Sequence, residues 1–239
     1  MALRYTALFV VSMLWAIGNT AQSPSAAGSF AYTFSVYALK PISKEGLFFR
    51  DATGQYIELA LETKRRSRAY EATLLHQSPE LSFHRKEIAE DGHDFMRLVA
   101  RRRIQQPEAA HSLLIFSSHP KSNQGGLEDV AEFQIIEMDD SRSTFPRGSI
   151  RLLNATGVHV VGDINGERFE LMQNESSQAV TELDTSKAQV SVAARGKERY
   201  RLLYKNLIPV SDKTRSLLII RPPTREGSFK IGGRLLVDH

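Results

Sequence analysis

The stretch "SLLIF", residues 112–116, returns near the end of the chain as "SLLII", residues 216–220. Each is a continuous apolar run, which is typical of a central strand that is buried on both faces of a sheet. Prolines follow both runs, at Pro120 and at Pro222–Pro223, and end the strands. The pair therefore predicts two similar β units, each built around one buried strand.

Two further pairs of segments extend this match. "GLFFRDATG" (46–54) parallels "GSIRLLNATG" (148–157), and "DFMRLVA" (94–100) parallels "RYRLLYK" (199–205). The three spacings are nearly equal: 148 − 46 = 102, 200 − 95 = 105 and 216 − 112 = 104. Matches in the same order at one spacing predict a tandem duplication of a unit of about 100 residues.

A phenylalanine-led segment recurs before, between and after the two units, beginning at Phe34, Phe133 and Phe229. It marks the expected boundaries of the units. We therefore expect one domain over residues 28–140 and a second over residues 141–239.

Apolar and polar residues alternate within each unit, which indicates strands. In "QYIELALET" (55–63), Ile57, Leu59 and Leu61 share one face. "VHVVGDINGERFELM" (158–172) predicts a hairpin whose type I′ turn is Asn165–Gly166. We expect its counterpart in the first unit at "ETKRRSRAYEA" (62–72).

About seven short strands in each unit predict an all-β protein of two tandem immunoglobulin-like β-sandwich domains. The cysteine and tryptophan hallmarks of antibody domains are absent, because the chain has no cysteine and its one tryptophan is Trp15. A small barrel stays open as the alternative architecture.

The N-terminus has the three-part layout of a secretory signal peptide, assigned to residues 1–27. Arg4 precedes an uncharged apolar run over residues 7–17, and small residues follow it up to Ala27. Cleavage after Ala21 or after Ala27 fits the pattern. The run is too short to span a bilayer. An exported chain without cysteine indicates a bacterial periplasmic or secreted protein.

"FPRGSIRLLNAT" (145–156), followed by "RSLLII" (215–220) and "LLVDH" (235–239), carries a resemblance. It resembles an FPxGSxRxxNxT-like pattern of uncharacterised exported bacterial β-proteins. The likeness covers mostly the second unit. It implies bacterial export and no particular activity.

The sequence lacks the motifs that carry common catalytic chemistry. It has no G-x-S-x-G, no H-E-x-x-H and no glycine loop for phosphate. "GDING" (162–166) lacks the further acidic ligands of a calcium loop, so the hairpin interpretation is preferred. We therefore predict a protein that is not an enzyme and needs no cofactor or metal.

Two groups of polar residues are candidate sites. His93 lies beside Asp91 and Asp94, which suits a base or a metal ligand, but a polar surface turn explains it better. Asp139 and Asp140 point to opposite faces if the strand continues, so they are expected to end it. The polar segment 139–148 is then the predicted linker, with few contacts across it and early proteolytic cleavage.

Charge divides the chain in two. Residues 28–140 carry 14 Lys/Arg and 17 Asp/Glu, a net −3, whereas residues 141–239 carry 16 and 10, a net +6. The candidate anion-binding site is a row of cations on one strand face, and it comprises Lys197, Arg199, Arg201 and Lys205. On the opposite face, Tyr200, Leu202 and Tyr204 are predicted to be core. Lipid phosphate, an acidic glycan or an acidic protein surface fits such a row, whereas nucleic acid does not suit an exported protein without stacking aromatics.

Three function classes follow. The first is an exported, non-enzymatic structural or interaction protein of the bacterial envelope or secretome. The second is a periplasmic assembly chaperone with two immunoglobulin-like domains, which a long unpaired edge strand would favour. The third is a glycan-active hydrolase, which a deep cleft lined by two acids would favour.

Overall fold

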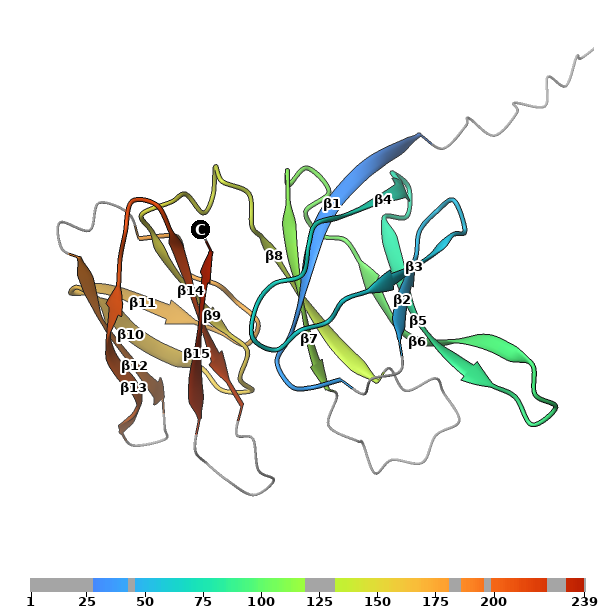
Figure 1. The fold of residues 1–239 in the computed structure, drawn as a ribbon. Helices are drawn as coiled ribbons and strands as arrows, with labels where there is room; N and C mark the ends of the chain where they lie inside the picture. The colour runs from blue at the N-terminus through green and yellow to red at the C-terminus, as the bar shows by residue number, and fades with distance from the viewer. Residues whose placement is uncertain are drawn as a thin grey trace, which may run out of the picture.

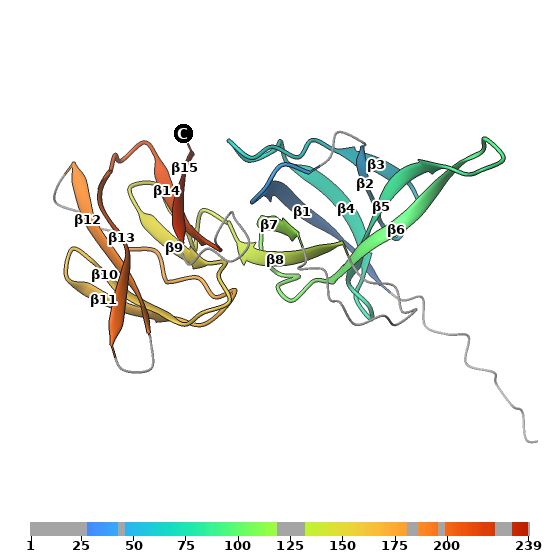
Figure 2. The same cartoon turned by 90° about the horizontal axis from the view of Figure 1, so that it is seen from below.

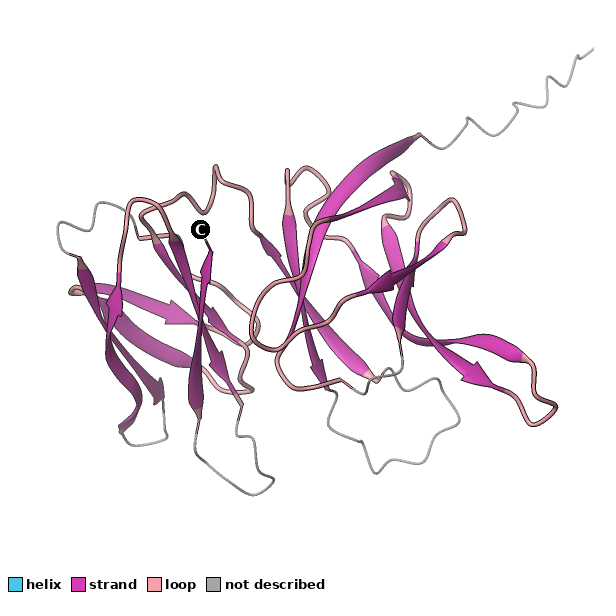
Figure 3. Ribbon diagram, in the orientation of Figure 1, coloured by secondary structure: helices cyan, strands magenta, loops and turns pink. Residues whose placement is uncertain are grey.

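The computed structural model describes residues 28–42, 46–118, 132–180, 186–195, 199–222 and 231–238. Strands and loops make up all of these residues, and none of them is helical (Figure 3). The all-β class predicted from the sequence is confirmed. The expected signal peptide, residues 1–27, lies outside the described residues. Within the described residues there is no helix of the length and apolarity needed to cross a membrane.

The strands, in chain order, are β1 Ser29–Ala38, β2 Leu47–Arg50, β3 Tyr56–Leu59, β4 Tyr70–Leu75, β5 Glu80–Ile88, β6 Asp94–Arg103, β7 Ser112–Ser118, β8 Phe133–Asp139, β9 Ile150–Asn154, β10 Val160–Ile164, β11 Glu167–Leu171, β12 Lys187–Arg195, β13 Tyr200–Pro209, β14 Arg215–Arg221 and β15 Gly232–Asp238.

The N-terminal half, residues 28–140, forms two four-stranded sheets that pack face to face. Sheet A has the order β4-β1-β7-β8, and sheet B has the order β3-β2-β5-β6. Alternation decides which side chains enter the core between them. In β4, Tyr70, Ala72 and Leu74 are buried and their neighbours are not. They join a core that includes Phe34 of sheet A and Phe83 of sheet B.

The C-terminal half, residues 141–239, repeats this layout with sheet C, of order β15-β14-β9, and sheet D, of order β11-β10-β12-β13. Segment 176–180 lies antiparallel along the other edge of β9 through isolated bridges. The core between sheets C and D is tightly filled. A Cβ at Gly162 would lie 2.1 Å from the Ser191 carbonyl oxygen and 2.5 Å from the Phe169 ring, so only glycine fits there.

The four sheets stack in the order B, A, C, D, as Figures 1 and 2 show from two directions. A third apolar cluster fills the seam between sheets A and C, and it includes Leu113 and Ile115 of β7 and Leu217 and Ile219 of β14. The alternate residues of the same strands face the cores within each half, Leu114 in the N-terminal half and Leu218 in the C-terminal half. This explains why "SLLIF" and "SLLII" are apolar throughout, and the prediction that both strands are buried on both faces is confirmed.

The two halves share one strand order. Segment 176–180 occupies beside β9 the place that β4 occupies beside β1. In each half the first strand pairs parallel with the "SLLI" strand, β1 with β7 and β9 with β14. Each half also has a bulge at the same place in its hairpin, at Val99 in β6 and at Leu203 in β13. The bulges have the same spacing as the "SLLI" serines, because 203 − 99 = 104 and 216 − 112 = 104.

One of the predicted sequence equivalences is wrong. "GLFFRDATG" forms β2, whereas "GSIRLLNATG" forms β9, whose counterpart is β1. The likeness comes from a shared turn. Asp51 Oδ1 accepts hydrogen bonds from the backbone N–H and hydroxyl of Thr53, and Asn154 Oδ1 accepts the same two bonds from Thr156. Local turn chemistry therefore produced a match that the topology does not follow.

Two related assignments need the same correction. Phe34 lies in β1, so it is not the counterpart of Phe133 in β8, which corresponds to β15. The counterpart of the β10–β11 hairpin is β2–β3, and segment 62–72 leads into β4 instead. The hairpin turn itself is confirmed, because Asn165 and Gly166 both have positive φ, at 52° and 87°.

The predicted linker is not an exposed tether. Phe145 is fully buried, and Asp140 and Ser141 are nearly so, whereas residues 142–144 and Arg147 are exposed. Phe145 belongs to the apolar seam between the halves. The expectation of few contacts across residues 139–148 is therefore wrong, because the seam needs an apolar side chain at its margin and the connecting segment supplies it.

Candidate functional site

The predicted row of cations is divided by the structure. Lys197 lies outside the described residues, and Arg199 lies just ahead of β13. Arg201 pairs with Ala194 of β12, on the side that faces the core, whereas Lys205 pairs with Ser191, on the outer side of sheet D. The remaining cations are exposed, but they do not share one strand face.

The β13 bulge causes this difference. Side chains alternate between faces along a strand, and one extra residue reverses the alternation beyond it. Leu203 is that residue, because Leu202 pairs with Ala193 and Tyr204 with Val192. Tyr204 packs toward the core as predicted, against Gly233. The prediction that Tyr200 and Leu202 are core is wrong, since they are 58% and 60% exposed.

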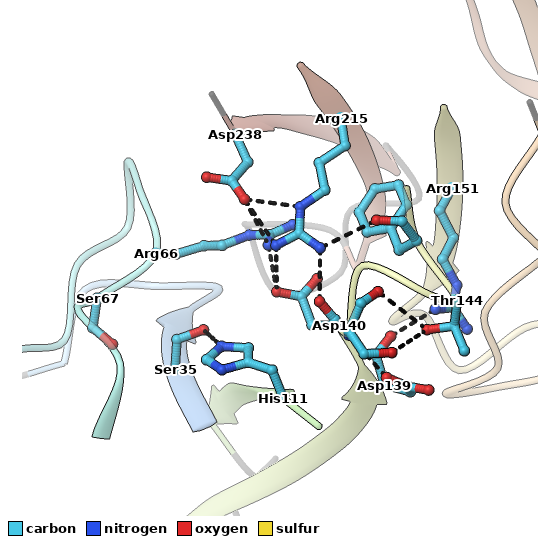
Figure 4. Close-up of polar contacts among 12 residues, drawn as sticks. Ser35, Arg66, Ser67, His111, Asp139, Asp140, Thr144, Arg151, Arg215 and Asp238 are labelled. Carbon is cyan, nitrogen blue, oxygen red and sulfur yellow. Dashed lines mark hydrogen bonds and ion pairs between the residues drawn. The ribbon is translucent and has the colours of Figure 1, made fainter. Parts of the chain in front are cut away.

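A second set of charged residues lies at the seam between the halves, and the sequence did not point to it (Figure 4). Arg66 comes from the loop between β3 and β4, Asp140 follows β8, Arg215 opens β14 and Asp238 closes β15. Arg66 Nη1 bonds Asp140 Oδ2 and lies 3.5 Å from Asp238 Oδ2. Arg215 Nη2 lies 3.2 Å from Asp140 Oδ2 and 2.8 Å from Asp238 Oδ2. We call these four residues the seam cluster.

Phe145 supports the seam cluster from the connecting segment. The guanidinium groups of Arg66 and Arg215 lie 5.9 Å and 5.1 Å from the centre of its ring, within the range of cation–π attraction. Arg215 Nη1 also donates to the backbone oxygens of Asp140 and Phe145. Two positive and two negative side chains therefore share one partly apolar environment beside the Phe145 ring.

Burial dominates the electrostatics of this cluster. It raises the pKa of Asp140, against the attraction of Arg66 and Arg215. It also lowers the pKa of Arg66. The pKa of Asp238 is lowered, because hydrogen bonding to Arg215 and the charge of Arg66 outweigh its desolvation. Arg66 Nε, Arg66 Nη2 and Asp140 Oδ1 are buried without a hydrogen-bond partner among the described residues. The cluster links the two halves through the ion pairs Arg215–Asp140 and Arg66–Asp238.

The seam cluster lines a pocket of about 490 Å³, and His111 lines it too. The Nε2 atom of His111 lies 3.2 Å from Ser35 Oγ. Burial lowers the pKa of His111. His93, the histidine that the sequence singled out, lies instead in the exposed turn between β5 and β6, where its backbone N–H donates to Asp91. The turn interpretation of His93 is consistent with this position.

Acidic side chains also line a groove of about 590 Å³ between the halves, among them Glu137, Asp139 and Glu175. Each of the three is already engaged as an acceptor: Glu137 by the backbone of Gln105 and Gln106, Asp139 by Ser141 and Glu175 by Met172. Hydrogen bonds lower the pKa of Asp139, whereas a general acid needs a raised one. The groove gives little support to the hydrolase hypothesis.

Among the described residues, no group of three or more His, Asp or Glu side chains is placed to hold a metal ion. Asp139 and Asp140 do diverge, as the sequence suggested, one toward Ser141 and the other toward the arginines. Sequence signals for the seam cluster exist in retrospect. Phe145 is a large apolar residue inside a polar segment, and Arg215 directly precedes a buried strand.

No protein-family model matches the chain, and no curated protein matches it significantly.

Proposed function

We propose that this chain is an exported, non-enzymatic interaction protein of the bacterial envelope or secretome. Its two immunoglobulin-like domains, residues 28–140 and 141–239, are in this proposal copies of one ancestral unit. The shared strand order, the parallel pair in each half and the bulges 104 residues apart (203 − 99 = 104) support the duplication.

One observation carries the proposal. The halves are joined by an apolar seam and an ionic cluster, and sheet D lies at the far end of the stack with the long edge strand β13 (Figure 1). A firmly joined pair of domains suits a protein that holds a partner when one strand edge pairs with no other described strand. Apolar side chains exposed on that strand, at Tyr200, Leu202 and Leu207, mark it as a contact surface.

The test follows export and contact in living cells. The chain is produced with its leader in a bacterial host, and a photo-crosslinking amino acid replaces Leu207 in β13 or Ile88 in the β5–β6 hairpin. We expect N-terminal sequencing of the envelope fraction to show a mature chain that begins after Ala21 or Ala27. We also expect a discrete adduct from position 207. Retention in the cytoplasm with an intact leader would disprove the export part.

The long edge strand also favours the second class, a periplasmic assembly chaperone, because such proteins hold clients by strand pairing. The two classes differ in the lifetime of the complex. A chaperone's client leaves on assembly, so its adduct is found only during a short pulse of synthesis. The partner of a structural interaction protein stays. Pulse–chase labelling before illumination separates the two.

A further inference from the structure

The edge strands β6 and β13 occupy corresponding places in the two halves. Each ends its sheet, and each carries the bulge, at Val99 and at Leu203. One edge of β13 pairs with β12 from Lys187↔Pro209 to Arg195↔Tyr200. The backbone groups on the other edge of such a strand form a template for a further extended segment.

In the N-terminal half, a residue of the chain itself already contacts the corresponding edge. Glu132, immediately ahead of β8, donates its backbone N–H to the bulge residue, Val99, at 2.9 Å. Its carboxylate accepts from Arg85 Nη2 at 3.0 Å and from Arg97 Nη2. One residue of the chain itself, Glu132, therefore lies against the β6 edge through its backbone N–H and its carboxylate.

In the C-terminal half the corresponding arginine lacks these partners. Arg201 stands where Arg97 stands, since 201 − 97 = 104, and it pairs with Ala194 as Arg97 pairs with Arg85. Arg97 binds two carboxylates, those of Glu87 and Glu132. Arg201 and Lys205 are exposed, and neither forms an ion pair with another described residue.

The sequence accounts for the missing acids. Glu87 lies two residues after Arg85, and the residue two after Ala194 is Gly196. Ile136 of β8 and Arg234 of β15 occupy corresponding positions, because each pairs with the isoleucine of its "SLLI" strand. Glu132 lies four residues before Ile136, and the residue four before Arg234 is Lys230. Gly196 and Lys230 are outside the described residues. A glycine and a lysine thus replace both acids at the corresponding sequence positions.

The outer side of β13 is largely apolar, with Lys205 as its one cation. Tyr200, Leu202 and Leu207 are on it and are more than half exposed, whereas Phe95 is the one large apolar residue of β6 that is exposed. A segment paired with β13 would have alternate side chains beside this apolar row and beside Arg201. The fitting segment therefore alternates apolar residues with acidic ones.

We propose that the edge of β13 away from β12 binds an extended, alternating apolar and acidic segment of a partner protein, with its carboxylate on Arg201. This inference rests on the proposed interaction function and names the partner's chemistry. The segment repeats on β13 what Glu132 does on β6. A second copy of β13 is a poor occupant, because the strand contains no carboxylate and brings the same unpaired cations.

The test uses the mature full chain and a fluorescein-labelled nine-residue peptide that alternates valine with glutamate. Binding is measured by anisotropy at low and high salt. We expect Arg201→Gln to weaken binding about fivefold at low salt, as for an exposed ion pair, and high salt to remove the difference. The matched control is Arg97→Gln, at the same place in the other half, which should leave the affinity unchanged.

Two further peptides separate charge from backbone pairing. A valine–glutamine version should bind the natural chain about as weakly as the glutamate peptide binds Arg201→Gln. A glutamate version with alternate backbone amides methylated should not bind, because it cannot pair as a strand. Equal binding of the glutamate and glutamine peptides, or no binding of either, would overturn the inference.

Sedimentation velocity tests whether a second copy of the chain occupies the β13 edge. A dimer that Leu202→Glu dissolves would assign the edge to a second copy and overturn the proposal. Failure of the peptide arm is distinct from failure of the proposed function. If the crosslinked partner is still captured in cells while no peptide binds, the protein interacts through another contact, and only the edge assignment falls.

Discussion

At the scale of single residues, Asp140 is the charged side chain on which the seam cluster depends most. Its carboxylate faces Arg66 and Arg215 and is almost completely buried, so it is the negative charge that both arginines share. Removing one partner of a buried ion pair leaves an uncompensated charge, which costs far more than an exposed pair contributes. The sequence marks Asp140 only as the second of two adjacent acids.

Asp140→Asn keeps the size of the side chain and removes its charge. We expect it to lower the free energy of unfolding by about 3 kcal/mol, because Arg66 and Arg215 then share Asp238 alone. Urea denaturation at neutral pH measures this loss. Asp212→Asn, at an exposed position, is the control and should change stability by less than about 0.5 kcal/mol. A loss no larger than the control's would show that the seam cluster contributes little.

Two histidines, the buried His84 and the half-buried His111, should make stability depend on pH. Burial lowers the pKa of His84 and of His111; Arg66 and Arg215 lower that of His111 further, while Asp140 and Asp238 oppose them. The unfolded chain, with a histidine pKa of about 6.5, takes up protons at a higher pH than the folded chain. The free energy of unfolding therefore falls as pH drops below about 6.5. The raised pKa of Asp140 acts in the opposite sense, in the carboxylate range.

Urea denaturation between pH 5 and pH 8 is the measurement. We expect a positive slope of unfolding free energy against pH on the acid side, reduced by His84→Gln or by His111→Gln and nearly removed by the double change. An unchanged slope in the double variant would assign the pH dependence to other groups.

At the scale of elements, the bulge in β13 decides which side chains are buried. Without an extra residue, strict alternation would place Tyr200 and Leu202 with Tyr204 in the core, as the sequence pattern indicates. The extra residue, Leu203, reverses the alternation, so Tyr204 covers Gly233 and Leu202 faces outward. β6 has the same bulge at Val99, which makes it a feature of the hairpin in both halves.

Leu202→Ser tests this assignment directly. The side chain is 60% exposed, so we expect a change in unfolding free energy within about 0.5 kcal/mol. Leu218→Ser, at a fully buried position of β14, should cost at least about 3 kcal/mol. Thermal or urea unfolding distinguishes the two. A Leu202→Ser loss comparable to that of Leu218→Ser would restore the original face assignment.

At the scale of the whole molecule, the charge difference between the halves is partly used within the protein. Three arginines of the basic half donate across the seam to acceptors of the acidic half. Arg151 reaches the Asp139 carbonyl, Arg215 reaches Asp140, and Arg221 Nη1 lies 3.5 Å from the Leu39 carbonyl oxygen. The net +6 of the second half therefore does not all remain for an external anion.

The seam predicts how the protein responds to protease and to unfolding. Segment 139–148 is anchored by the buried residues Asp140, Ser141 and Phe145, although the residues between and after them include exposed ones. We therefore expect limited proteolysis of the native chain to leave this segment intact, whereas the sequence alone predicts early cleavage there. Phe145→Ala opens the seam and should lower stability by about 3 kcal/mol. It should also make the segment susceptible to cleavage. Mass spectrometry of the fragments checks this, and early cleavage of the natural chain within 139–148 would contradict the buried seam.

The sequence by itself determined the all-β class, the buried "SLLI" strands and the Asn165–Gly166 hairpin. These features depend on residues close together in the chain, through alternation, apolar runs and turn chemistry. The spacing of 104 residues between the "SLLI" pairs (216 − 112 = 104) was also readable, because a buried strand tolerates little change in its apolar pattern.

Only the tertiary structure decided which strands correspond and where the charges meet. The "DATG" and "NATG" turns look equivalent because they make the same local hydrogen bonds, yet strand pairing places them in different strands. Leu203 is an ordinary residue until register makes it a bulge. Arg66, Asp140, Arg215 and Asp238 are separated by up to 172 residues (238 − 66 = 172) and form one cluster because sheets A and C pack together. No local pattern encodes such a contact, since its energy depends on burial that the whole stack creates.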